Sequence, residues 1–219
     1  MNELIKQIEK QIKQIFVGEA TGHDWYHIDR VRKNALKLQE KEGGDRFVIE
    51  LGALLHDVSD YKFNGGDEFL GGEVAKMMIL ENGGSNEIAS QIQIIVNSIS
   101  FKGANVVDKT ESLEAKIIQD ADRLDAIGAI GIARTFAYGG KVGNPIYDPE
   151  IPYKLHTSFE EYKMSKSTTI NHFYEKLLLL GDRMHTEAAK EIANQRIEFM
   201  NDFLSQFYNE WNIQDTDGQ

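Results

Sequence analysis

The chain has 219 residues, a formal net charge of −11 and no cysteine. This length suits one domain with a substantial core, and the negative charge disfavours a main function in binding duplex nucleic acid. Without cysteine, disulfides, thiolate metal sites and cysteine nucleophiles are excluded, and a cytoplasmic location is the simplest expectation. Any metal site must therefore use nitrogen and oxygen ligands.

No stretch approaches the roughly 20 apolar residues that span a bilayer, and the first residues do not lead into a signal-peptide core. We therefore expect no membrane association. The spacing of apolar residues instead predicts an all-α bundle. Helices are expected at about residues 2–17, 24–42, 46–59, 68–82, 85–100, 112–138 with a break near Gly128 or Gly131, 159–180 and 184–210.

The dipeptide His56-Asp57 closes the apolar run 51–55, where an imidazole and a carboxylate are costly to bury without a partner. A divalent metal is one of the few partners that satisfies both groups. A second histidine, His27, lies upstream, and the acidic cluster 120–125, with Asp122 and Asp125 three residues apart, lies downstream. Together these residues predict a site with two histidine and two aspartate ligands.

Helix geometry sets a condition on this site. Adjacent helical residues diverge by about 100°, so His56 and Asp57 reach one ion only near the end of a helix. A site with four nitrogen and oxygen ligands leaves coordination positions open on Mn, Fe, Co, Ni or Mg, as a hydrolytic metal requires.

The motifs at residues 22–31, 53–58 and 120–128 resemble those of the HD-domain metal-dependent phosphohydrolases, in particular a bacterial single-domain subgroup. The resemblance covers about residues 20–140 and implies one HD-type helical domain over 1–219, with a metal-binding core at 20–140 and a C-terminal helical extension at about 155–212. It implies one divalent metal held by His27, His56, Asp57 and Asp122, and hydrolysis of phosphate esters or anhydrides, usually of nucleotides.

Neighbouring residues are candidates for catalysis and substrate binding. Lys62, Arg30 and Arg123 are expected to neutralise substrate phosphates. The catalytic candidates are Asp60, for orienting His56 or the attacking water, His23 for proton transfer, and the ligand Asp57.

Alternatives remain for these cations and for Asp125. Arg30 could instead pair with Asp29 or brace Asp57, and Asp60, Lys62 and Arg123 could be solvated or structural. Asp125 is expected to support the ligands rather than bind the metal. We assign no role to His156, His172 or His185.

Asn97 stands where many relatives have histidine, which disfavours a second metal and the cyclic-dinucleotide branch of the family. The branch that releases pyrophosphate from nucleoside triphosphates fits better. The alternative is a metal-containing module that binds a nucleotide or a protein partner as a regulator without turnover, and a homodimer is compatible with either function. The segment from Gly139 to Pro152 is expected to border the active-site mouth, where Tyr138 and Tyr147 could stack a base and Lys141 could meet a phosphate.

Overall fold

The structure is a computed structural model that describes residues 2–18, 22–58, 70–99, 110–155 and 167–214. Within these ranges every regular element is a helix, which confirms the all-α prediction. The elements are α1 (Asn2–Ile15), α2 (Trp25–Glu42), α3 (Arg46–Leu55), α4 (Leu70–Glu81), α5 (Asn86–Ile99), α6 (Leu113–Asp125), α7 (Gly128–Val142), the π-helix η1 (Phe173–Leu177), the 3-10 helix η2 (Leu178–Arg183) and α9 (Glu187–Trp211).

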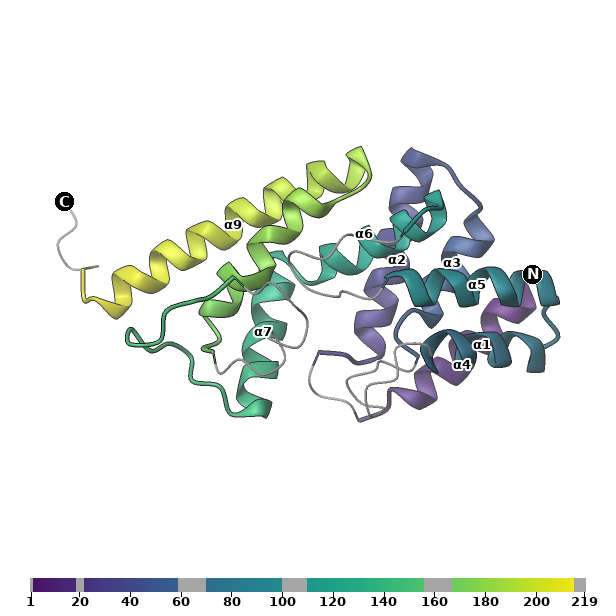
Figure 1. The fold of residues 1–219 in the computed structure, drawn as a ribbon, viewed down its shortest axis with the longest axis horizontal. Helices are drawn as coiled ribbons and strands as arrows, with labels where there is room; N and C mark the ends of the chain where they lie inside the picture. The colour runs from purple at the N-terminus through teal and green to yellow at the C-terminus, as the bar shows by residue number, and fades with distance from the viewer. Residues whose placement is uncertain (1, 19–21, 59–69, 100–109, 156–166, 215–219) are drawn as a thin grey trace.

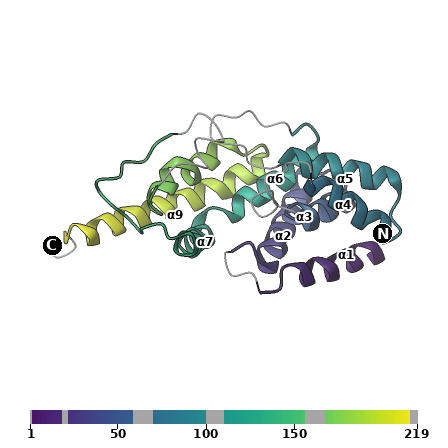
Figure 2. The same cartoon turned by 60° about the horizontal axis from the view of Figure 1, so that its bottom comes forward.

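Helix α6 is the central element. It contacts α2, α3 and α5, which precede it in the chain, and α7 and α9, which follow it. Figures 1 and 2 show α1, α4 and α5 at one end of an elongated molecule and the last turns of α9 at the other. The buried apolar side chains form one cluster that includes Ile8 on α1 and Leu204 on α9. The helices that carry the metal motif and the C-terminal helices therefore share a core.

Side-chain caps fix where the site-bearing helices begin. Asp24 Oδ1 accepts the backbone N–H of His27 at the start of α2 (2.9 Å), and Ser112 Oγ accepts that of Ala115 at the start of α6 (3.1 Å). Asp45 caps α3 in the same way. Each such cap contributes about 0.5–2 kcal/mol. These caps set the register in which α2, α3 and α6 present their polar residues.

Helix α3 ends earlier than the predicted residue 59. Its last helical residue is Leu55, and the chain turns there with a hydrogen bond from Val58 N–H to the Leu55 carbonyl. His56 and Asp57 thus lie just past a helix end. Two adjacent residues can bind the same ion only at such a position.

The sequence predicted that this helix ends at residue 138, but helix α7 continues through the Gly139-Gly140 pair to Val142. Gly139 packs so tightly against Thr169 that a Cβ there would lie 2.3 Å from Thr169 Oγ1. This glycine therefore permits close packing instead of stopping the helix. The helix ends at Gly143, whose φ of 77° is left-handed.

The helix predicted at 159–180 is only partly regular in the residues that the structure describes. The backbone N–H groups of Thr169 and Ile170 donate to the carbonyls of Pro145 and Ile146 (2.9 and 3.0 Å). These bonds compete with helical ones, so helical structure begins at residue 171 and continues as η1 and η2. Residues 159–166 lie outside the described ranges.

None of the described helices combines the length and the apolar character needed to cross a lipid bilayer.

Candidate metal centre

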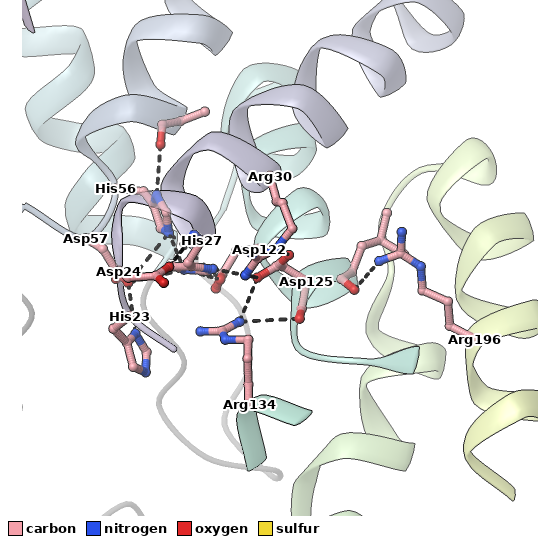
Figure 3. Close-up of polar contacts among 12 residues, drawn as sticks. His23, Asp24, His27, Arg30, His56, Asp57, Asp122, Asp125, Arg134 and Arg196 are labelled. Carbon is pink, nitrogen blue, oxygen red and sulfur yellow. Dashed lines mark hydrogen bonds and ion pairs between the residues drawn. The ribbon is translucent and has the colours of Figure 1, made fainter. Parts of the chain in front are cut away.

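The four predicted metal ligands converge where α2, α3 and α6 meet (Figure 3). The Nε2 atoms of His27 and His56 are 3.3 Å apart, and His27 Nε2 lies 3.4 Å from Asp57 Oδ2 and 3.5 Å from Asp122 Oδ1. His56 Nε2 lies 3.7 Å from Asp57 Oδ2 and 3.8 Å from Asp122 Oδ1. Two nitrogens and two carboxylate oxygens therefore face a common point.

These distances fit a shared divalent cation. Donors that bind one ion at about 2.0–2.2 Å lie about 2.8–3.6 Å apart when the angle between them is 90–109°. The separations of 3.3–3.8 Å lie in the upper part of this range or slightly above it. Small inward movements of the carboxylates would complete the coordination.

Hydrogen bonds fix which nitrogen of each imidazole carries the proton. His56 Nδ1 lies 2.9 Å from the carbonyl oxygen of Ala53, which can only accept, so His56 carries its proton on Nδ1. His27 Nδ1 lies 2.7 Å from Asp125 Oδ2 and must also be the donor, because that carboxylate is ionised. In the neutral rings both Nε2 atoms therefore direct lone pairs toward each other at 3.3 Å. A cation between them turns this repulsion into attraction, and metal-binding histidines commonly have their second nitrogen held in this way.

Asp57 is ionised in this surrounding. Burial opposes its charge, but the positive charge of a protonated His56 and the hydrogen bonds from protonated His23 and His27 hold the pKa of Asp57 well below its ordinary value. His23 Nδ1 lies 3.3 Å from Asp57 Oδ2, and its side chain is partly exposed. His23 thus lies at the rim of the ligand cluster, and His23, His27 and Asp57 also form a group within metal-binding distance of one another.

Asp125 supports His27 from behind. Its buried carboxylate accepts His27 Nδ1–H, Arg30 Nε–H (2.6 Å), Arg30 Nη2–H (3.0 Å) and Arg134 Nη1–H (2.9 Å). Burial opposes ionisation of this carboxyl, but the bonds from His27 and Arg30 and the charge of Arg134 hold its pKa well below the ordinary value. Arg30 is therefore a brace, as one alternative allowed, although it braces Asp125 and not Asp57.

One side of the centre is open. The side chains of His27 and His56 are almost fully buried, whereas that of Asp122 is 40% exposed. A ligand from solvent can therefore approach a cation in the cluster from the Asp122 side.

Arg123 lies apart from the cluster. It is buried, and its Nη1 donates to the carbonyl of Arg183 and contacts His185 Nε2 at 3.2 Å. The substrate-binding role predicted for it stays a prediction. Lys62 and Asp60 lie outside the described residues.

The same face of α6 holds the start of α9. Asp120 accepts the backbone N–H groups of His185 (2.9 Å) and Thr186 (2.8 Å) and the Thr186 hydroxyl (2.8 Å). Burial raises the pKa of Asp120 despite these bonds. His185 Nε2 also lies 2.6 Å from Gln119 Oε1. His185, to which the sequence assigned no role, is thus part of the contact between α6 and α9.

The segment after α7 packs on the far part of α9. The Tyr147 ring lies 5.0 Å from Trp211 and 5.5 Å from Tyr208, measured between centroids. Tyr147 is therefore already in contact with aromatic partners of its own chain. Tyr138 is partly exposed, and the role of this segment in substrate selection stays a prediction.

Arg134 is the site residue that sequence reasoning missed. It contacts Asp125 only because the chain breaks after α6 and resumes in α7, with Gly128 at a φ of 74°. Its place within residues 20–140, which resemble the HD-domain family, was the one available signal, and that resemblance does not distinguish it from an ordinary surface arginine.

An all-helical fold with a centre of two histidines and two aspartates defines the class of helical metal-dependent hydrolases. Residues 24–127 match the HD domain model. The chain is 36% identical over 202 residues to the uncharacterized protein YpgQ of Bacillus subtilis, which covers 92% of this chain and 90% of that protein. The chain therefore belongs to the HD-domain family of metal-dependent phosphohydrolases, which confirms the resemblance seen in the sequence.

Solved structures agree with this assignment. A Lactobacillus plantarum protein matches with a TM-score of 0.84 at 35% identity, covering 95% of this chain and 97% of that one. An HD-superfamily hydrolase from Bacillus thuringiensis matches with a TM-score of 0.74 at 43% identity, covering 96% and 98%. YpgQ of Bacillus subtilis in complex with ADP matches with a TM-score of 0.74 at 34% identity, covering 94% and 97%.

Proposed function

We propose that this protein is a nucleoside-triphosphate pyrophosphohydrolase that depends on one divalent metal. The observation that carries the proposal is the convergence of two imidazole lone pairs and two carboxylate oxygens at a point that is open on the Asp122 side. A divalent cation at this point would satisfy both buried Nε2 atoms and both carboxylates at once. The ADP complex of YpgQ supports a nucleotide as the substrate class.

The protein's own residues would hold and orient the reactants. A divalent metal supplies Lewis-acid polarisation of a phosphoryl oxygen and activation of a water. His27, His56, Asp57 and Asp122 would hold that metal, and Asp125 would keep His27 in the binding tautomer. The contact between His23 and Asp57 supports a proton-transfer role for His23 at the rim. Asp60 and Lys62 remain candidates for orienting the water and neutralising phosphate charge.

The complete ligand set favours catalysis over a purely regulatory module. The open side beside Asp122 serves nucleotide binding and hydrolysis alike. A partly exposed histidine at the rim of the ligand cluster is a feature that hydrolysis uses for proton transfer and that binding alone does not need.

The test is a panel of ribo- and deoxyribonucleoside triphosphates with added Mn²⁺, in which released phosphate and pyrophosphate are measured separately. We expect pyrophosphate and a nucleoside monophosphate as products. Orthophosphate as the first product would assign a phosphatase reaction instead. Nucleotide binding without either product would support the regulatory module.

A further inference from the structure

Arg134 is held at the edge of the ligand cluster by Asp125. Its Nη1 donates to Asp125 Oδ2 (2.9 Å) and to the Asp125 carbonyl (3.3 Å). The same Oδ2 accepts His27 Nδ1–H at 2.7 Å. The guanidinium is therefore one carboxylate oxygen away from a metal ligand, and its side chain is 15% exposed.

Gly22 holds Arg134 from the other side. Gly22 has a φ of 83°, and a Cβ there would lie 2.9 Å from Arg134 Cγ and 3.2 Å from Arg134 Nε. The next residue, His23, contacts Asp57. In Figure 3, His23 and Arg134 lie on the same side of the cluster, whereas Arg30 approaches Asp125 from the opposite side. The short segment 22–24 thus connects the rim histidine, Arg134 and the start of α2.

The two arginines use their nitrogens differently. Arg30 directs both Nε and Nη2 at Asp125. Arg134 uses Nη1 alone, and its Nε has no hydrogen-bond partner among the residues that the structure describes. A buried donor without a partner costs stability and therefore calls for an explanation, such as strain, a bound water or a bound ligand. Fewer nitrogens of the Arg134 guanidinium than of the Arg30 guanidinium therefore bind Asp125.

The charges around Asp125 also favour a role for Arg134 in binding an anion. Arg30 and Arg134 carry two positive charges, and Asp125 carries one negative charge. The charges of Asp57 and Asp122 would be balanced by a divalent cation. Arg30 is also paired electrostatically with Asp24 and Asp29, whereas Arg134 forms an ion pair with Asp125 alone among the described carboxylates. The planar donors of arginine suit phosphate oxygens.

We infer that Arg134 binds a phosphate group of the substrate beside the metal centre, with Asp125 and Gly22 fixing the direction of its guanidinium. This inference rests on the proposed nucleotide function and names a residue that contacts the transferred or the adjacent phosphate. Arg30 is the brace of Asp125, and Arg134 is the cation that meets the substrate.

The test uses the full-length protein with Mn²⁺ and ADP as probes. Mn²⁺ affinity is measured alone, and ADP affinity is measured with Mn²⁺ present, for the wild type, Arg134→Gln and Arg134→Lys. Arg196→Gln is the matched control, because Arg196 Nη1 donates to the carbonyl of Leu124, the residue before Asp125, from the α9 side. We expect Arg134→Gln to weaken ADP binding by about tenfold or more, which corresponds to loss of a charge-assisted contact. Arg134→Lys should weaken it less, and Arg196→Gln should leave it unchanged.

Mn²⁺ affinity should stay within about threefold of the wild type in all three variants, because Arg30 still holds Asp125. A second pair of variants tests whether the close contact between Gly22 and Arg134 fixes the position of the arginine side chain. Gly22→Ala should weaken ADP binding, whereas Gly18→Ala should not, since Gly18 shares a φ of 83° but a Cβ there meets nothing within 4 Å.

Three results would overturn the inference. ADP affinity of Arg134→Gln equal to that of the wild type would remove Arg134 from the substrate site. A parallel loss of Mn²⁺ affinity would show that Arg134 acts only through Asp125 and His27. A wild type that neither binds ADP nor hydrolyses any nucleotide of the panel would overturn the proposed function and the inference together. The first two results overturn the inference alone, so the two failures can be told apart.

Discussion

Asp125 provides the sharpest test of the metal centre, because its carboxylate holds the imidazole of His27 in place without itself being a predicted ligand. It accepts hydrogen bonds from His27, from two nitrogens of Arg30 and from Arg134, and it is only 2% exposed. Asp125→Asn keeps the shape but removes the charge. If its amide oxygen accepts from His27, its amide nitrogen opposes the donor of Arg30. Asp125→Ala removes every one of these bonds.

Loss of such a supporting partner typically lowers metal affinity by about 10- to 100-fold. The asparagine variant can keep one neutral bond to His27, so we expect about a tenfold loss of Mn²⁺ affinity, or about 1.4 kcal/mol. For Asp125→Ala we expect about 100-fold. Breaking a buried ion pair costs about 3–5 kcal/mol, and the partial exposure of Arg30 reduces this to roughly 2–4 kcal/mol for the metal-free alanine variant. Its Tm should fall by about 4–16 °C.

Mn²⁺ binding is measured by calorimetric titration well below the Tm, and stability by thermal unfolding in the presence of a chelator. Asp29→Ala is the matched control, because Asp29 lies near Arg30 on the same helix but forms its ion pair with Lys33 (2.6 Å) and does not contact Asp125 in the described structure. It should change neither quantity appreciably. If Asp125→Ala binds Mn²⁺ as tightly as the wild type, His27 does not need this support, and our account of the tautomer is wrong.

Three further outcomes are expected. Elemental analysis after gentle purification and Mn²⁺ soaking should find about one divalent metal per chain, because the two groups of potential ligands among the described residues share His27; two tightly bound metals, or none, would refute the mononuclear centre. His56→Ala and Asp57→Ala should each abolish metal-dependent turnover while circular dichroism stays helical, and unchanged turnover in either variant would exclude that residue as a ligand. Gly139→Ala should destabilise the protein by about 1–3 kcal/mol through overpacking against Thr169, whereas Gly140→Ala, with open space around it, should stabilise α7 by about 0.5–1 kcal/mol; equal effects in thermal unfolding would contradict the packing described for Gly139.

The convergence of the four predicted ligands could be anticipated from the sequence because they lie at positions that local structure determines. His27 follows a capping aspartate by three residues, and His56-Asp57 follows an apolar run that ends a helix. Residue type, order along the chain and the positions of helix ends were therefore enough to predict that these four side chains lie close together. The packing of α2 on α6 and α3 then gives the distances, which no local pattern contains.

The cations around the centre were harder to predict, because proximity in sequence is a poor guide on a helix. Arg123 follows the ligand Asp122, but adjacent helical residues point about 100° apart, and Arg123 faces the start of α9. Arg30 lies three residues after His27 and shares its face, so it reaches the same carboxylate. Arg134 depends on the direction in which α7 leaves α6, which is a tertiary property.

Helix α6 explains why the C-terminal helices belong to the site. One face carries Asp122 and Asp125, which form the centre and its support. Another carries Asp120 and Arg123, which hold the backbone just before α9 through bonds to residues 183–186. The HD match ends at residue 127, yet the similarity to YpgQ spans 92% of the chain. Because α6 is held on both faces, we expect its contacts with the start of α9 to help fix the position of Asp122 and Asp125.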